Sequence, residues 1–184
     1  MKYIILIPIY NDRESLKLLI DNINNEIKDL NHDISLVVIN DASSQQIIDT
    51  YPNIENISSI EIINMKENRG HARCIAAGLK YIFEKKEFDY VIPMDGDGED
   101  RPEEIKNFIY LSEQSGEKSI TGERVKRSEG LFFQLCYRFH KFLTLAFTGQ
   151  SIKFGNFTCL SKSTVKKLLD EKATWNSFSG SLKK

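Results

Sequence analysis

At 184 residues, with 41% hydrophobic and 28% charged residues, the chain has the composition of an ordinary globular protein and the length of one domain with a substantial core. Its formal net charge of −1 argues against general nucleic-acid binding, which requires a clearly basic face. Its three cysteines form no CxxC pair, and no apolar stretch approaches the ~20 residues that span a bilayer. We therefore expect a single cytoplasmic domain over residues 1–184, without a zinc site or a disulfide framework.

The first half of the sequence alternates between strand and helix patterns. Residues 3–7 form a continuous apolar run typical of a buried parallel strand, and we expect further strands at 34–39 and 90–94 and a weaker one at 59–63. Apolar residues at helical spacing predict three helices, one behind residue 11, one over 71–85 and one over 102–115. We expect Asn11 and Glu14 to form the N-cap and N3 pair of the first helix, and Asp100 to be the N-cap of the third.

This order of elements predicts an α/β fold with a mainly parallel sheet and right-handed crossovers. In such sheets, ligands bind beyond the carboxyl ends of the strands. Three loops that carry carboxylates or amides follow strands and should converge there, at residues 8–12, 40–44 and 95–100. The sequence therefore predicts a binding site at this edge of the sheet.

The loop at residues 95–100 reads Asp-Gly-Asp-Gly-Glu-Asp and comes directly after a buried strand. Four carboxylates this close together repel one another unless a positive charge lies among them. Carboxylate oxygens suit Mg²⁺ or Mn²⁺, and Mg²⁺ usually takes one or two protein carboxylates together with phosphate oxygens of a substrate. Asp95 and Asp97, which would share one face of a regular strand, are the predicted metal ligands. The alternative is a solvated acidic turn that only caps the next helix.

The second half of the sequence is less regular. We expect strands at residues 119–122 and 154–160 and a short helix at 163–171. Between the two strands, a helix over 131–147 would be apolar around most of its circumference. Such a helix either belongs to the core or lies against a membrane or a partner, where aromatic and basic residues mix.

In their order and spacing, these motifs resemble those of the inverting nucleotide-sugar glycosyltransferases of family 2. That family has the GT-A fold, which is a three-layer α/β/α arrangement around a mainly parallel mixed sheet. The resemblance is closest to the transferases that use dolichyl or undecaprenyl phosphate, and it covers about residues 3–170. The segments that carry it are residues 8–12 (Pro-Ile-Tyr-Asn-Asp), 39–43 (Ile-Asn-Asp-Ala-Ser), 68–73 (Asn-Arg-Gly-His-Ala-Arg) with Gly78, 94–104, and 155–157 (Gly-Asn-Phe).

The resemblance implies that the first two loops bind the nucleotide of a nucleotide-diphosphate sugar. The loop with Pro8, Tyr10 and Asp12 would cradle the nucleotide, and Asp12 stands where the family usually has glutamate. Asp41 would contact the base or the ribose. It lies in a turn where Ala42 replaces the glycine of the family pattern, and glycine is the residue best suited to such turns.

The resemblance also implies how the diphosphate is held. Gly70 would begin the second helix close to the nucleotide, and Arg73 would face phosphate one turn later or else form a surface salt bridge. Asp95 and Asp97 would form the DxD motif, whose ribose and metal contacts hold the pyrophosphate. A bound cation neutralises the charge that develops on a departing nucleoside diphosphate. Glu99 would add a ligand or touch the sugar, or would remain a solvent-facing acid.

On the acceptor side, basic residues of related transferases meet the phosphate of a polyprenyl-phosphate acceptor, and Arg124 and Arg127 occupy that place here. Arginine suits phosphate because its guanidinium donates charge-assisted, bidentate hydrogen bonds. The helix over 131–147 would lie where the lipid tail approaches, in peripheral contact with the inner face of the cell membrane. An ionised phosphate needs no strong general base, so we interpret His140 as structural. A glycan is the alternative acceptor.

Two departures from the family pattern refine this expectation. The Gln-x-x-Arg-Trp signature of processive polysaccharide synthases is missing, which argues against a polymerase. Relatives would continue past Lys184, so we expect a domain shortened at its C-terminus. The expected function is metal-dependent sugar transfer in cell-envelope glycan synthesis, and the alternative is a non-catalytic nucleotide-sugar-binding module left by truncation. A nicotinamide-binding enzyme is not expected, because no Gly-x-Gly-x-x-Gly follows the first strand.

Overall fold

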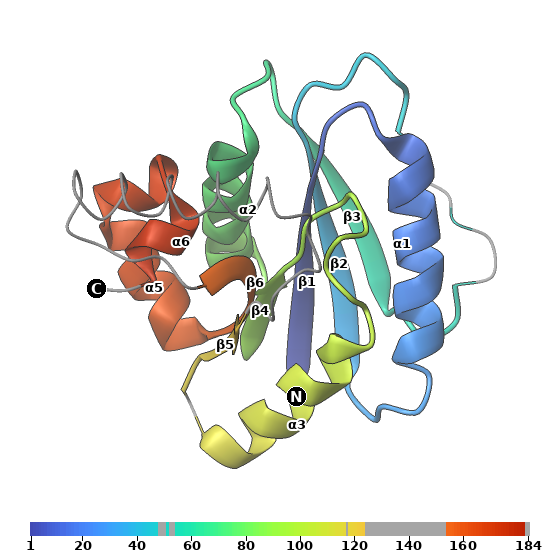
Figure 1. The fold of residues 1–184 in the computed structure, drawn as a ribbon, viewed down its shortest axis with the longest axis vertical. Helices are drawn as coiled ribbons and strands as arrows, with labels where there is room; N and C mark the ends of the chain where they lie inside the picture. The colour runs from blue at the N-terminus through green and yellow to red at the C-terminus, as the bar shows by residue number, and fades with distance from the viewer. Residues whose placement is uncertain (48–50, 52–53, 117, 124–153, 183–184) are drawn as a thin grey trace, which may run out of the picture.

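The computed structural model describes residues 1–47, 51, 54–116, 118–123 and 154–182. Within them, six strands form one sheet in the order β3-β2-β1-β4-β6-β5 (Figure 1). The strands are β1 (Lys2–Ile9), β2 (Asp33–Asn40), β3 (Ser59–Asn64), β4 (Tyr90–Pro93), β5 (Ile120–Glu123) and β6 (Phe154–Ser161). The helices are α1 (Arg13–Glu26), α2 (His71–Lys85), α3 (Glu104–Ser115), α5 (Lys162–Asp170) and α6 (Phe178–Ser181), with a 3₁₀ helix η1 (Lys172–Trp175).

The sheet is mainly parallel. Strands β3, β2, β1 and β4 all run in one direction, and in their register Ile5 lies between Leu36 and Ile92. Strand β6 runs antiparallel to both β4 and β5, so the sheet is mixed. Because β1 to β4 are parallel, the loops that follow them all leave the sheet at one edge, which we call the carboxyl edge.

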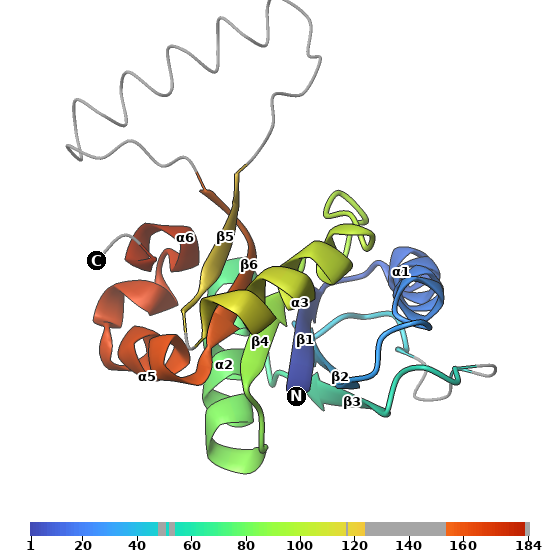
Figure 2. The same cartoon turned by 90° about the horizontal axis from the view of Figure 1, so that it is seen from below.

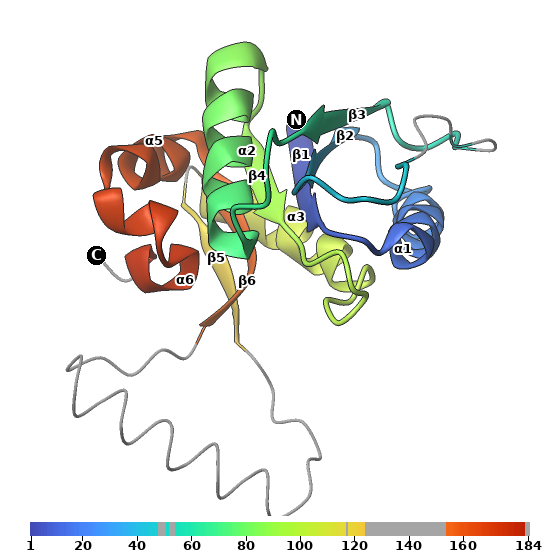
Figure 3. The same cartoon turned by 90° about the horizontal axis from the view of Figure 1, so that it is seen from above.

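Helices cover both faces of the sheet, as expected from strands that are apolar on both sides. Successive side chains of β1 point to opposite faces. Ile5 and Ile7 pack with α1 and α3, whereas Ile4 and Leu6 pack with α2, α5 and Phe178 of α6. Figures 2 and 3 show the same three layers from below and from above. The expected three-layer α/β/α architecture with a mainly parallel mixed sheet is confirmed.

The expected cap of α1 was misplaced by one residue. Asp12, not Asn11, is the N-cap, and its side chain accepts a hydrogen bond from the Ser15 amide at 3.2 Å. Asn11 instead adopts a left-handed backbone conformation with φ of 52°, which Asn tolerates better than most residues. Both residue types are good caps, so the choice between them depended on contacts that Asn11 makes with a distant loop.

The expected cap of α3 was also wrong. This helix begins at Glu104 without a side-chain cap, two residues later than the sequence suggested. The carboxylate of Asp100 accepts a hydrogen bond from the backbone N–H of Asp95, at 2.8 Å, and so closes the acidic loop on itself. A short loop with two glycines can fold back in this way. The Asp100 carboxylate then bonds within the loop and does not cap α3.

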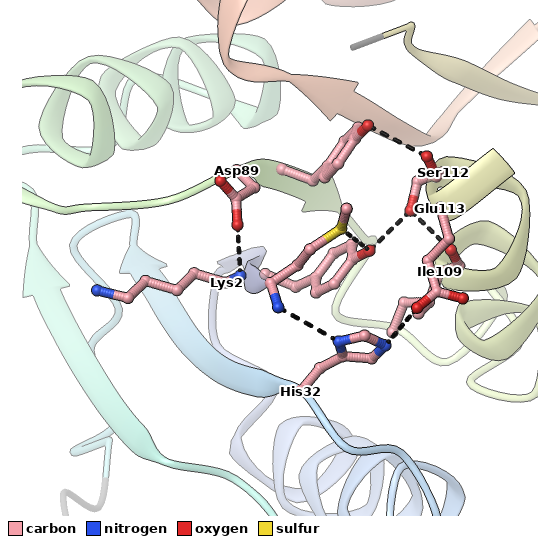
Figure 4. Close-up of polar contacts among 9 residues, drawn as sticks. Lys2, His32, Asp89, Ile109, Ser112 and Glu113 are labelled. Atoms are coloured by element: carbon pink, nitrogen blue, oxygen red, sulfur yellow. Dashed lines mark hydrogen bonds and ion pairs between the residues drawn. The ribbon is translucent and has the colours of Figure 1, made fainter. Parts of the chain in front are cut away.

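Polar contacts at the opposite edge of the sheet fix α3 to the start of β1 (Figure 4). The buried hydroxyls of Tyr3 and Ser112 lie 2.8 Å apart, and Ser112 donates to the carbonyl of Ile109 at 2.7 Å. His32 contacts Glu113 of α3 at 3.1 Å. Burial is the main cause that raises the pKa of Tyr3 to about 12, so its hydroxyl stays protonated and can donate. This network holds the helix that directly follows the acidic loop.

No helix within the described residues is both long enough and apolar enough to cross a membrane. The helix expected over 131–147 lies outside them, as do Arg124 and Arg127.

Gly78 sets how closely α2 approaches the sheet, and replacing it tests the packing. A Cβ atom at this position would lie 2.3 Å from Leu6 Cδ1 and 3.0 Å from Ile39 Cγ1. We expect Gly78→Val to lower the free energy of unfolding by about 1–3 kcal/mol, the usual cost of overpacking, as measured by urea denaturation.

Lys80→Val is the matched control, because it introduces the same β-branched residue on the same helix at a side chain that is 56% exposed. It should change the free energy of unfolding by no more than about 0.5 kcal/mol. Equal stability of the two variants would contradict the packing assigned to Gly78.

Candidate functional site

The loop after β1 is tied to the loop after β2 by Asn11. Its side-chain oxygen accepts hydrogen bonds from the backbone N–H groups of Ser44 at 2.8 Å and Gln45 at 3.3 Å. Its own backbone N–H donates to the hydroxyl of Ser43 at 2.9 Å. These contacts fix the backbone next to Tyr10, which is 53% exposed and therefore accessible to a ligand.

The loop after β2 is tied in turn to the start of α2 by Asp41. This residue is only 4% exposed, and its two carboxylate oxygens accept the backbone N–H groups of Arg69 at 2.7 Å and Gly70 at 2.8 Å. Gly70, the N-cap of α2, has a φ of 85° that favours glycine. Ala42 has a φ of 56°, so the glycine-like turn of the family pattern is kept by an alanine. Such a conformation costs a non-glycine residue about 1–2 kcal/mol.

Asp95, two residues after the end of β4, is held by side chains from two other elements. Its Oδ1 atom lies 2.8 Å from Nε2 of His71, the first residue of α2. The same oxygen accepts a longer hydrogen bond, at 3.4 Å, from the side-chain amide of Asn156 on β6. The Asp95 side chain is 21% exposed and that of His71 is 45% exposed, so both are accessible at the surface of the site.

The acidic loop raises the pKa of His71. The hydrogen bond that the His71 ring donates to Asp95 is the largest cause, and the charges of Asp95, Asp97 and Asp100 act in the same direction against partial burial. Because the folded-state pKa is raised, the stabilisation from this contact is full below the ordinary value of 6.5 and is lost as pH rises through the folded-state value. The loop therefore attracts positive charge at this position.

The acidic loop also packs closely against the end of β1. A Cβ atom on Gly96 would lie 2.9 Å from the carbonyl oxygen of Pro8, which is buried. After this contact the loop turns outward, and Asp97 and Glu99 are both exposed. The Asp97 carboxylate accepts the backbone N–H of Glu99 at 2.9 Å, which keeps the turn tight.

The donor atoms of this loop fit a hard divalent cation. In the part of the chain that the structure describes, no group of three or more His, Cys, Asp or Glu side chains is arranged to hold a metal. A site of one or two carboxylates is nevertheless the usual one for Mg²⁺, because substrate phosphates and water supply its other ligands. Asp95 and Asp97 are the two carboxylates that would bind the cation here.

The remaining predicted residues that the structure describes lie around the same edge. Arg73 is exposed on the first turn of α2, and Asp12 is half-buried at the start of α1. A depression of about 480 Å³ lies beside Asp12 and is lined by polar residues of the first two loops, namely Asn11, Asp12, Arg13, Glu14, Gln45 and Gln46. Its lining does not include the acidic loop. Arg124 and Arg127 are outside the described residues.

Sequence reasoning assigned no role to His71 or Asn156, although both lie in motifs that carried the family resemblance. A usable signal for His71 was its place directly after Gly70, at the start of a helix that opens at the carboxyl edge. Asn156 gave no comparable signal, because β6 reaches Asp95 from a distant part of the chain.

Residues 4–165 match the family model described as Glycosyl transferase family 2. The chain is 27% identical over 172 residues to the undecaprenyl-phosphate 4-deoxy-4-formamido-L-arabinose transferase of Proteus mirabilis (strain HI4320), an alignment that covers 92% of this chain and 50% of that protein. The chain therefore spans about half the length of the curated relatives it matches.

Two solved structures share the fold. The mannosyltransferase PcManGT from Pyrobaculum calidifontis, in complex with GDP-Man and Mn²⁺, matches with a TM-score of 0.55 and 19% identity over 91% of this chain and 45% of its own. S. aureus TarS 1-349 in complex with UDP-GlcNAc matches with a TM-score of 0.52 and 20% identity over 71% of this chain and 37% of its own. Both are GT-A glycosyltransferases. Because the family model covers most of the chain and the architecture is that of the GT-A fold, the chain belongs to glycosyl transferase family 2.

Proposed function

We propose that the chain binds a nucleotide-diphosphate sugar at the carboxyl edge of the sheet and transfers the sugar to an acceptor, with a polyprenyl phosphate as the favoured acceptor. The observation that carries this proposal is that Asp95 is held in place where the loops after β1 and β2 are also joined to the start of α2. Family membership supports the reaction class. The two nucleotide-sugar complexes among the fold relatives support the class of donor.

The loops after β1 and β2 would bind the nucleotide. Tyr10 offers an exposed aromatic face on which a base can stack, which is a common way of binding bases. Asp41 would contact the base or the ribose as well as ordering its own loop, because each carboxylate oxygen can accept more than one hydrogen bond. Pro8 and Asp12 would shape the cradle, and Gly70 and Arg73 would lie near the phosphates.

Asp95 and Asp97 would hold Mg²⁺ or Mn²⁺ beside the pyrophosphate, and Glu99 would contact the metal or the sugar. When bound, the cation neutralises the charge that accumulates on the leaving nucleoside diphosphate. In an inverting transfer, the acceptor oxygen forms a bond to the anomeric carbon as the bond from that carbon to the diphosphate oxygen breaks. The leaving diphosphate keeps the electron pair of that bond.

The proposed acceptor carries a phosphate on a polyprenyl chain. The P. mirabilis relative is named for transfer to undecaprenyl phosphate, which supports an acceptor of the same chemical class here. Arg124 and Arg127 would bind the acceptor phosphate, and residues 131–147 would approach a membrane from the cytoplasmic side. A glycan acceptor and a binding module without turnover remain the competing proposals.

Donor binding can be measured by thermal shift with UDP-, GDP- and CDP-sugars, with and without Mn²⁺. A donor that binds only the folded state should stabilise it by about 2.7 kcal/mol at a free concentration of 100 Kd.

Asp97→Ala should weaken Mn²⁺-dependent donor binding by more than ~10-fold. Glu103→Ala, which removes an exposed acid from the same connection between β4 and α3, should leave this binding unchanged. Retained binding by the Asp97 variant would reject Asp97 as a ligand, and binding without transfer to any acceptor would favour the binding module.

Cation binding at Asp95 can be read from His71. The hydrogen bond to Asp95 and the negative charges of the acidic loop raise the pKa of His71, so a cation bound there should lower that pKa. We expect Mg²⁺ to shift the NMR titration of the His71 ring to lower pH. The ring signals of His32, which contacts Glu113 at the opposite edge, serve as an internal control and should not respond. An unchanged His71 titration at saturating Mg²⁺ would argue against a cation beside Asp95.

A further inference from the structure

We infer that His71 is a positioning residue that holds Asp95 in the orientation needed to bind the donor and its cation. The inference rests on the proposed function of the same site and assigns a role to a residue outside the expected ligand set. His71 Nε2 lies 2.8 Å from Asp95 Oδ1, across a separation of 24 residues in the sequence. The contact therefore joins α2 to the acidic loop.

His71 is itself held by the loop after β2. The carboxylate of Asp41 binds the backbone N–H groups of Arg69 and Gly70, which directly precede it. The carbonyl of Gly70 then accepts the backbone N–H groups of Arg73 and Cys74, both at 3.1 Å, which begins the helix. His71 is thus fixed at its backbone on both sides. Through its ring, His71 links the loop after β2 to the acidic loop.

Asp95 lies where such a support has an effect. It stands directly before Gly96 and close to Gly98, which has a φ of 79°, and glycine-rich backbone is the most conformationally free. The Asp100 carboxylate restrains the backbone N–H of Asp95, but it does not orient the side chain. Within the described residues, the side chains of His71 and Asn156 both donate to Oδ1, and the bond from His71 is the shorter, at 2.8 Å against 3.4 Å.

Because the His71–Asp95 pair is partly exposed, a positioning role and a stabilising role predict different results when the His71 ring is removed. The His71 side chain is 45% exposed, and solvent-exposed ion pairs contribute little to stability. Loss of the ring should therefore leave the fold almost unchanged. In contrast, replacing a residue that orients a metal ligand typically lowers metal affinity by roughly 10–100-fold. A change in affinity without a change in stability is the expected signature.

The experiment compares His71→Leu, His71→Gln and His71→Asn with the unaltered chain. Mn²⁺ affinity is measured by electron paramagnetic resonance without donor, and donor affinity is measured by calorimetry with Mn²⁺. We expect His71→Leu to weaken Mn²⁺ binding ~10-fold or more, with the melting temperature almost unchanged. His71→Gln places an amide N–H near the position of Nε2 and should restore affinity to within about 2-fold. His71→Asn is too short to reach Asp95 and should behave like the leucine variant.

Lys80→Gln, on the exposed surface of the same helix, is the control and should bind Mn²⁺ and donor normally. If His71→Leu does not fold, the comparison of the glutamine and asparagine variants decides the question. Equal affinity of all the His71 variants, with normal binding by the unaltered chain, overturns the role of His71 and leaves the proposed function standing. Absence of Mn²⁺ and donor binding by the unaltered chain overturns both.

Discussion

Hydrogen bonds from polar side chains join the loops at the carboxyl edge of the sheet, and the candidate site depends on them. Asn11 ties the loop after β1 to the loop after β2, Asp41 ties that loop to the start of α2, and His71 reaches the acidic loop after β4. Loops of this kind have few apolar contacts of their own, so without such bonds their relative positions would be weakly defined. With them, one continuous set of contacts runs from Asn11 to Asp95.

The core gives these contacts a rigid base. Strand β1 is apolar on both faces, and its alternating side chains pack against helices of both outer layers. Gly78 lets α2 approach the sheet closely, which brings the start of α2 to the edge where His71 meets Asp95. At the far edge, the bonds of Tyr3 and Ser112 hold α3, so the acidic loop is anchored at both of its ends. Packing and polar contacts thus act together on one short segment.

Much of the fold could be predicted from the sequence, because its signals are local. Buried strands such as residues 3–7 are visible as continuous apolar runs, and α2 is visible as a helical stripe that ends where predicted, at Lys85. Both cap assignments at Asn11 and Asp100 were wrong, because each side chain bonds to backbone outside the helix that it was expected to cap. No local pattern distinguishes a cap from such a contact.

The candidate site was predictable in its location but less so in its contacts. The convergence of the loops followed from the strand order. Asp95 lies beside His71, in the segment 68–73 that carried part of the family resemblance. The use of His71 as its support required the position of α2 relative to β4, which spacing alone does not give. The expectations for Arg124, Arg127 and residues 131–147 fall outside the described residues and stay predictions.

Binding of a donor and its cation at the carboxyl edge of the sheet can be tested by paramagnetic broadening of backbone NMR signals on addition of Mn²⁺ with a donor that binds. We expect strong broadening centred on residues 95–99, with weaker effects near Tyr10 and Gly70 and none at Lys2, His32 or Asp89 on the opposite edge. Broadening centred on that opposite edge, or spread evenly over the chain, would contradict it.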